Sequence, residues 1–327
     1  MRNPERFPKD ARVMFIGDSI TCNGTFIAHI QEYYMTRFPA DRVKLYNAGV
    51  SGGNVWDSAL RYLEADLALF EPTHAVLMIG MNDIWRGHYM AKEHYTDIKT
   101  EHNRHYFEGV SLLSEKLYEH GIPLIFCTPT PFDDEMACEV PAGKNLAMAL
   151  TGYGHFCVGL AEKYGAPVVD FNSALTLANR RLQEKDPARS LIGPDRVHPT
   201  PEGHAFMATV FLRAQGFTDL PEATAEVCEE SGIALSLSPK NTERFEVEKK
   251  LRTLRCAVYF SMGDKWNAPY EERLAFARSY IAENKDKANA NAFVLGCVET
   301  YLENAPHEEE YAASLLRLTD ALYEGAL

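Results

Sequence analysis

The chain of 327 residues contains no uninterrupted apolar run of the roughly 20 residues that a membrane span needs. Its first 11 residues are polar and include two prolines, so they lack the apolar stretch of a secretory signal. Basic residues are also in short supply, because 33 lysines and arginines stand against 46 acidic residues and give a net charge of −13. These absences argue against a membrane protein, a secreted protein, and a main partner that is nucleic acid or an anionic membrane. We therefore expect a cytoplasmic protein.

Motifs of paired cysteines are absent as well. The seven cysteines form no Cys-x-x-Cys pair, and four of them lie in apolar or helix-like segments, which is typical of buried reduced thiols. Several histidines lie at spacings that fit no zinc motif and have no cysteine beside them: His88, His94, His102 and His105. The sequence therefore predicts no metal and no cofactor.

Apolar runs alternate with helical patterns from residue 12 to about residue 215. Five runs are candidate strands: Val13–Ile16, Val43–Asn47, Ala75–Ile79, Leu124–Cys127 and Pro167–Asp170. Helical patterns of the length that parallel crossovers need lie between or after them: Thr25–Arg37, Val55–Phe70, Arg104–Glu119, Lys144–Lys163 and Pro201–Ala214. This alternation predicts an α/β fold with a mostly parallel sheet that helices cover on both faces.

The pattern changes after Gly216. Residues 217–242 are polar and irregular, and four helical patterns follow: Glu243–Met262, Tyr270–Asn284, Asn289–Glu303 and Glu308–Leu322. We therefore divide the chain into a domain at 1–216 and a linker with a helical extension at 217–327. The apolar stripes of these helices predict a packed core or, as an alternative, a surface through which the chain forms a homo-oligomer.

Four short segments stand at the ends of predicted strands or just before the last helix of the α/β domain. They are Gly17-Asp18-Ser19, the segment Asn47–Gly53, Gly80-Met81-Asn82-Asp83, and Asp195-Arg196-Val197-His198. The carboxyl ends of parallel strands meet at one edge of a sheet, which is where α/β proteins bind ligands. We therefore expect these four segments to converge.

Each segment supplies a part that acyl transfer requires. Ser19 is the candidate nucleophile, and His198 is the candidate general base that a serine hydroxyl needs. Asp195, three residues before this histidine, can accept a hydrogen bond from Nδ1 and orient the imidazole. The backbone N–H groups of Ser19 and Gly52 and the side-chain amide of Asn82 are candidate donors to the oxyanion of a tetrahedral intermediate.

In these segments the chain resembles the SGNH hydrolases of the GDSL esterase/lipase group. That family is named for a serine, a glycine, an asparagine and a histidine in four blocks, and Ser19, Gly52, Asn82 and His198 occupy those positions here. The resemblance covers about Arg12–Gln215. It implies a flavodoxin-like three-layer α/β/α fold, no metal, and hydrolysis through an acyl-serine intermediate. The helical extension lies outside it.

Three further residues are candidates for substrate binding. Trp56 and Trp85 each follow a catalytic block closely and can line a pocket for an acyl group or a sugar ring, although packing in the core explains them equally well. Arg86 can pair with a carboxylate or phosphate of a substrate, and a surface position is the alternative. The segment Thr128–Gly143 follows the fourth strand and is a candidate pocket wall, with an ordinary loop as the alternative.

We predict a serine esterase that hydrolyses short-chain acyl esters, above all acetyl esters, with acetylated carbohydrates among the candidate substrates. The same residues suit an acyl-thioesterase or an acyltransferase, which differ only in the leaving group or the acceptor. A third hypothesis is a binding or scaffold protein whose function resides in the helical extension. The expected partner is a small-molecule acyl ester, with no nucleic acid and no membrane.

Overall fold

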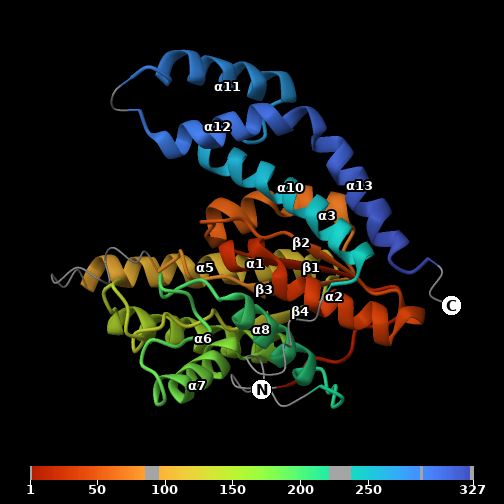
Figure 1. The fold of residues 1–327 in the computed structure, drawn as a ribbon, viewed down its shortest axis with the longest axis vertical. Coiled ribbons are helices and arrows are strands. Elements are labelled where there is room, and N and C mark those ends of the chain that lie inside the picture. Colours follow the sequence, from red (N-terminus) through yellow and green to blue (C-terminus); the bar gives the residue numbers. More distant parts are fainter. Residues whose placement is uncertain (1, 85–95, 221–236, 288–289, 325–327) are drawn as a thin grey trace. The chain divides into compact units, whose positions relative to one another are not determined.

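Five parallel strands form a single sheet in the computed structural model, which describes residues 2–84, 96–220, 237–287 and 290–324. The strands are β1 (Arg12–Gly17), β2 (Lys44–Asn47), β3 (His74–Met78), β4 (Leu124–Cys127) and β5 (Val168–Val169). Their spatial order is β2-β1-β3-β4-β5. Figure 1 labels the first four strands of this order. The chain therefore proceeds from β1 toward one edge and from β3 toward the other, which places the topological switch point between β1 and β3.

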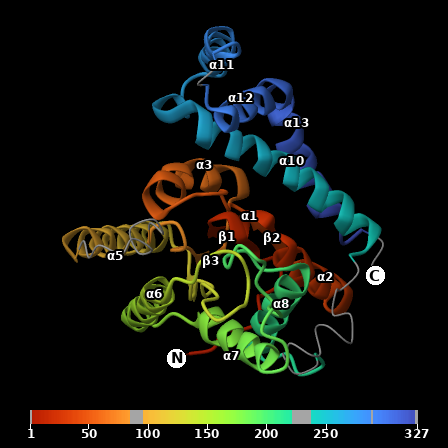
Figure 2. The same ribbon diagram turned by 60° about the vertical axis from the view of Figure 1, so that its left-hand side comes forward.

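Helices cover both faces of this sheet (Figure 2). They are α1 (Ser19–Asn23), α2 (Thr25–Arg37), α3 (Arg61–Phe70), α5 (Thr96–Glu119), α6 (Lys144–Tyr164), α7 (Phe171–Gln183) and α8 (Pro201–Ala214), with a π-helix η2 (Val55–Leu60) before α3 and a 3₁₀ turn η1 (Pro39–Asp41) after α2. The prediction of a three-layer α/β/α fold with a parallel sheet is confirmed.

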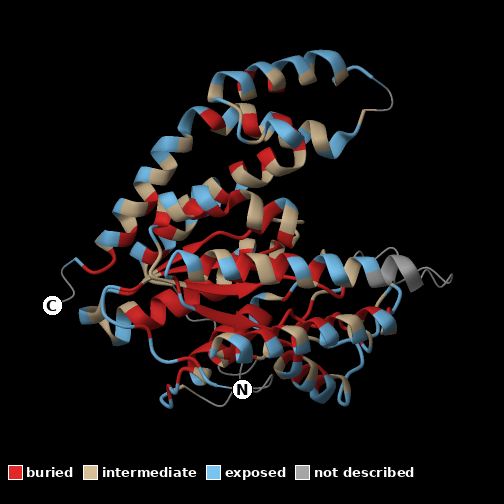
Figure 3. Cartoon of the chain, turned by 180° about the vertical axis from the view of Figure 1, so that it is seen from behind, coloured by how far each residue is buried: buried red, intermediate tan, exposed pale blue. Residues whose placement is uncertain are grey.

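Alternate residues of the strands pack on opposite faces, as the pleat of a strand requires. On one face, Phe15 of β1 contacts Phe26 of α2 and Phe211 of α8, with ring centroids 5.8 and 5.9 Å apart. On the other face, Tyr46 of β2 stacks on Phe70 of α3. The strands are buried almost throughout (Figure 3), which explains why they appear in the sequence as continuous apolar runs.

Helix α7 is missing from the sequence-based prediction. Asp170 caps it by accepting a hydrogen bond from the backbone N–H of Ser173. Its buried apolar residues recur at helical spacing, at Phe171, Leu175, Ala178 and Leu182. Because polar residues separate these apolar residues, the helical periodicity is hard to recognise in the sequence. The predicted helix over 55–70 begins as a π-helix, and the predicted strands agree with the observed ones to within one or two residues at each end.

The described chain divides into two compact units, Met1–Ser238 with Tyr323–Leu327, and Pro239–Leu322. The second unit consists of helices: α10 (Pro239–Met262), α11 (Tyr270–Asn284), α12 (Ala292–Asn304) and α13 (Glu308–Ala321), with short 3₁₀ turns η3 (Gly263–Lys265) and η4 (Ala305–His307). Its own core includes Leu254, Val258, Val298 and Tyr301. The sequence-based boundary at residue 216 stays a prediction, since residues 221–236 lie outside the described part.

Candidate active site

Ser19 is the first residue of α1, and only Asp18 separates it from the end of β1. Asp18 caps this helix, and its carboxylate accepts a hydrogen bond from a backbone N–H of the first turn at 3.0 Å. Gly17 makes the turn possible, because a Cβ at this position would lie 2.1 Å from Oγ1 of Thr21 and 2.3 Å from the carbonyl oxygen of Met78. The serine is therefore held at the C-terminal end of β1, beside β3 and at the switch point.

His198 and Asp195 complete a chain of hydrogen bonds that begins at Ser19. Nε2 of His198 lies 2.8 Å from Oγ of Ser19, and Nδ1 lies 2.5 Å from Oδ2 of Asp195. The other carboxylate oxygen accepts the backbone N–H groups of Val197 and His198 at 3.0 Å each, which fixes the carboxylate relative to the imidazole. The structure thus brings together the serine, the histidine and the aspartate that the sequence singles out.

Electrostatics favour the ionised form of Asp195. Partial burial by itself would raise its pKa, but the hydrogen bonds from the side chain and backbone of His198 and from the backbone of Val197 outweigh burial and lower the pKa. An ionised carboxylate accepts the proton of Nδ1 and so leaves the lone pair of Nε2 directed at Ser19. This is the tautomer that a general base for the serine hydroxyl requires.

The candidate oxyanion donors lie on turns that hydrogen bonds hold together. The side-chain amide of Asn82 donates to the carbonyl of Gly53 at 2.9 Å, which links the turn after β3 to the turn after β2. Gly52 has a φ of +71°, a left-handed conformation that favours glycine. An amide carries two N–H groups, and the bond to Gly53 uses one of them. Donation to an oxyanion would use the other.

Asn47 is a structural member of the site that sequence reasoning did not single out. Its side chain donates to the carbonyl of Thr21 at 2.6 Å and accepts from the backbone N–H of Gly49 at 2.8 Å. It is 3% exposed, so both bonds are shielded from water. Asn47 therefore fixes the Gly52 turn against helix α1. An asparagine at the last position of a predicted strand is the signal that the sequence offered.

Arg196 is a second residue of the site whose role the sequence did not reveal. It lies between Asp195 and His198, it is 4% exposed, and its φ is +65°. Its guanidinium donates to the carbonyl of Asp133 at 2.6 Å and to the carbonyl of Val140 at 2.7 Å. The buried arginine therefore anchors the loop that carries His198 to the segment after β4. The spacing Asp-x-x-His leaves the middle residues unspecified and gives no signal for this anchor.

Replacing Arg196 by alanine is expected to lower kcat for an aryl ester about 100-fold, with a smaller change in KM. The substitution leaves the carbonyl groups of Asp133 and Val140 without these donors and loosens the loop. A base displaced by about 1 Å transfers protons far more slowly. Steady-state kinetics measure both parameters. Arg181→Ala, an exposed arginine of α7, is the control. A kcat for Arg196→Ala equal to that of this control would contradict the anchoring role.

The candidate substrate-binding residues are only partly described. The indole N–H of Trp56 donates to the carbonyl of His105 in α5 at 2.8 Å, and the two rings stack with centroids 5.0 Å apart. Trp56 therefore packs on α5. Trp85 and Arg86 lie outside the described residues. Among the residues that are described, no group of three or more histidine, cysteine, aspartate or glutamate side chains is placed to hold a metal ion.

Two buried carboxyl groups flank the site and have perturbed pKa values. Burial raises the pKa of Asp18 to about 6, and hydrogen bonds from backbone N–H groups oppose this only in part. Burial also raises the pKa of Asp83 to about 7, although the backbone N–H of Val55 donates to its Oδ1 at 3.0 Å. The other oxygen of Asp83 is buried and has no hydrogen-bond partner among the described residues. At neutral pH, ionising Asp83 therefore opposes folding.

The contribution of Asp83 to the stability of the protein is expected to fall as the pH rises from about 4 to about 7. In this range the folded chain keeps the proton on Asp83 and the unfolded chain releases it. The folded state therefore loses stability with each unit by which the pH rises. In Asp83→Asn this loss should be smaller, by on the order of 3 kcal/mol between pH 5 and pH 8. Melting temperatures at the two pH values measure it. Asp286→Asn, which replaces an exposed aspartate shortly after α11, should behave as wild type.

The site and the fold together define a class of protein. A serine, an imidazole and a carboxylate joined in this order form the arrangement that serine hydrolases use. The model of the GDSL-like Lipase/Acylhydrolase family matches residues 15–206, which is more than half of the chain. The chain belongs to this family and is a carboxylic ester hydrolase. The prediction of an SGNH hydrolase of the GDSL group is confirmed.

Individual relatives agree with this assignment. An acetylxylan esterase from Geobacillus stearothermophilus is 29% identical over 226 residues, which are 63% of this chain and 94% of that protein. The crystal structure of an acetyl xylan esterase is 25% identical, with a TM-score of 0.51, over 62% of this chain and 98% of that one. A gut microbial diltiazem-metabolizing enzyme is 18% identical, with a TM-score of 0.81, over 99% of this chain and 97% of its own. This last similarity concerns the fold alone and extends over both units.

Among the described residues, no helix has both the length and the apolar composition that crossing a membrane demands.

Proposed function

We propose that the protein is a serine esterase that removes short acyl groups, above all acetyl, from carbohydrates through an acyl-serine intermediate. The observation that carries this proposal is the 2.8 Å contact between Oγ of Ser19 and Nε2 of His198. The 2.5 Å contact between Nδ1 and the ionised Asp195 supports it. A hydroxyl within hydrogen-bond reach of an oriented base is what nucleophilic catalysis requires.

In the proposed reaction, Nε2 of His198 takes the proton of Ser19 while Oγ attacks the ester carbonyl. The negative charge on the former carbonyl oxygen is held by the N–H groups of Ser19, Gly52 and Asn82. His198 then gives its proton to the leaving alcohol, and the acyl group stays on Ser19. A water molecule, deprotonated by the same imidazole, attacks the acyl-serine, and the carboxylic acid leaves as Oγ regains its proton.

The acetyl group and the carbohydrate are inferred from relatives and not from the triad itself. The two acetylxylan esterases are 29% and 25% identical to this chain and cover 63% and 62% of it. The triad alone suits thioesters and acyl transfer equally well, since these reactions differ in the leaving group and the acceptor.

A substrate panel tests the proposal. We expect the enzyme to release free acetate from acetylated xylo-oligosaccharides and from p-nitrophenyl acetate, and to hydrolyse p-nitrophenyl esters more slowly as the acyl chain lengthens. A preference for acyl-thioesters would contradict the esterase assignment. Acetylated acceptors in place of free acetate would identify an acyltransferase. The absence of turnover on every ester and thioester would support the hypothesis of a binding or scaffold protein.

A further inference from the structure

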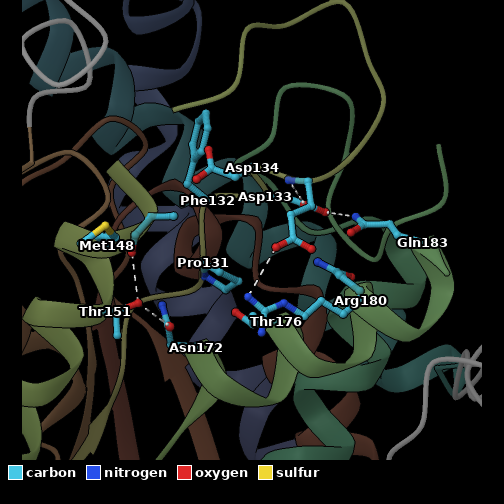
Figure 4. Close-up of a pocket in the computed structure, with 13 residues that line it drawn as sticks. Pro131, Phe132, Asp133, Asp134, Met148, Thr151, Asn172, Thr176, Arg180 and Gln183 are labelled. Atoms are coloured by element: carbon cyan, nitrogen blue, oxygen red, sulfur yellow. Dashed lines mark hydrogen bonds and ion pairs between the residues drawn. The ribbon is translucent and has the colours of Figure 1, made fainter. Parts of the chain in front are cut away.

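A pocket outside the triad opens beside the carboxyl ends of β4 and β5 (Figure 4). Its volume is about 360 Å³, which lies within the range of small-molecule sites. Its walls are residues 131–135 after β4, one side of α6 and one side of α7. Neither Ser19, His198 nor Asp195 lines it. The proposed chemistry therefore leaves this pocket without a role.

The charged groups of the pocket are paired within the protein. The carboxylate of Asp133 accepts hydrogen bonds from two backbone N–H groups, from the side-chain amide of Gln183 at 2.8 Å and from the hydroxyl of Ser190 at 2.5 Å. Glu135 forms an ion pair with Arg180 at 3.4 Å. A charged ligand would have to compete with these pairings. The pocket therefore favours a neutral ligand.

Neutral polar groups and apolar carbon share the remaining walls. Thr151 of α6 and Thr176 of α7 bring hydroxyl groups to the pocket, and Pro131 and Met148, which is 71% exposed, supply apolar surface. A sugar ring, with hydroxyl groups at its edge and C–H groups on its faces, matches both kinds of wall.

A hydrogen bond connects the pocket to the loop of the catalytic base. The backbone N–H of Asp133, a wall residue, donates to the carbonyl of Arg196 at 3.0 Å, and Arg196 lies two residues before His198. Because one residue of extended chain spans about 3.5 Å, this wall lies on the order of 10 Å from the base. A ligand that occupies both places must be longer than a single sugar unit. The pocket therefore fits an oligosaccharide.

We propose that this pocket is a subsite for a neutral saccharide unit of the substrate, remote from the unit that carries the reacting acetyl group. The inference rests on the proposed function of Ser19 in hydrolysing acetylated carbohydrates. The subsite contributes binding energy for oligosaccharide esters and none for small aryl esters, which are too short to reach it. The segment after β4 then both lines the subsite and anchors Arg196.

Filling the pocket tests the inference. Thr176→Trp places a large side chain in the pocket, and Leu177→Trp places the same side chain at the next position of α7, which is 53% exposed and does not line the pocket. For acetylated xylotetraose, we expect Thr176→Trp to lower kcat/KM about tenfold through KM. Its kcat/KM for p-nitrophenyl acetate should stay within about twofold of wild type, and Leu177→Trp should match wild type on both substrates.

Ala147→Phe fills the pocket from α6, on the opposite wall, and is expected to behave as Thr176→Trp does. If both filled variants deacetylate xylotetraose as efficiently as wild type, the subsite is wrong and the esterase proposal stands. Equal losses on both substrates in both variants would also overturn the subsite. If wild type hydrolyses p-nitrophenyl acetate but never acetylated xylotetraose, the proposal of a carbohydrate substrate is wrong. The proposal of a saccharide subsite is then wrong as well.

Discussion

Replacing Ser19 by alanine is expected to lower kcat/KM for p-nitrophenyl acetate about 10⁴-fold or more. Without Oγ there is no atom to carry the acyl group, although the oxyanion donors and the base remain in place. Folding is expected to change little, because Ser19 is the first residue of α1 and the helix keeps its cap at Asp18. Initial rates on p-nitrophenyl acetate, with the melting temperature as a check on folding, measure the loss.

Ser173→Ala is the matched control for this variant. Ser173 is an exposed serine of α7, so its removal should leave both the rate and the melting temperature unchanged. Hydrolysis by Ser19→Ala at the rate of Ser173→Ala would exclude the acyl-serine pathway. That result would leave the hydrogen bond between Ser19 and His198 without a catalytic explanation.

Replacing Asp195 by asparagine has the second largest expected effect, a decrease in kcat of about 10³- to 10⁴-fold. The amide keeps the shape of the side chain, but it can turn an N–H toward Nδ1 of His198. The imidazole then carries its proton on Nε2 and presents a donor to Ser19 in place of a lone pair. Because the carboxylate is held ionised by its hydrogen bonds, the wild type avoids this tautomer.

The pH–rate profiles of wild type and Asp195→Asn complete this test. A purely structural role of Asp195 would leave the profile unchanged and lower the melting temperature. We expect the pH–rate profile to change. The melting temperature should change little, because the side chain of Asp195 is 49% exposed. Asp186→Asn, an exposed aspartate shortly after α7, serves as the control. A kcat within tenfold of wild type would show that His198 is oriented by other groups.

The sequence predicted the strands and the convergence of the four segments well, for a physical reason. Strands that are buried on both faces must be apolar throughout, and parallel strands bring their carboxyl ends to one edge. Ser19 and His198 could therefore be expected to meet across 179 residues of sequence.

The features that escaped prediction depend on side-chain packing between distant segments. Helix α7 places polar residues on its outer side, so its apolar stripe is diluted in sequence. The anchor made by Arg196 depends on the left-handed backbone of that residue and on carbonyl groups 56 and 63 residues away. The walls of the pocket beside α6 and α7 likewise come from three separate segments. No local sequence pattern indicates contacts between residues so far apart in the chain.

Labelling with a fluorophosphonate tests the central claim, that Ser19 is the nucleophile activated by His198 and Asp195, most directly. These reagents form a stable bond to an activated serine, and intact-mass and peptide analysis identify the modified residue. We predict one adduct per chain, on Ser19, that is absent in Ser19→Ala and forms far more slowly in Asp195→Asn. A folded protein that hydrolyses p-nitrophenyl acetate but carries no adduct on Ser19, or carries it on another residue, would contradict the account.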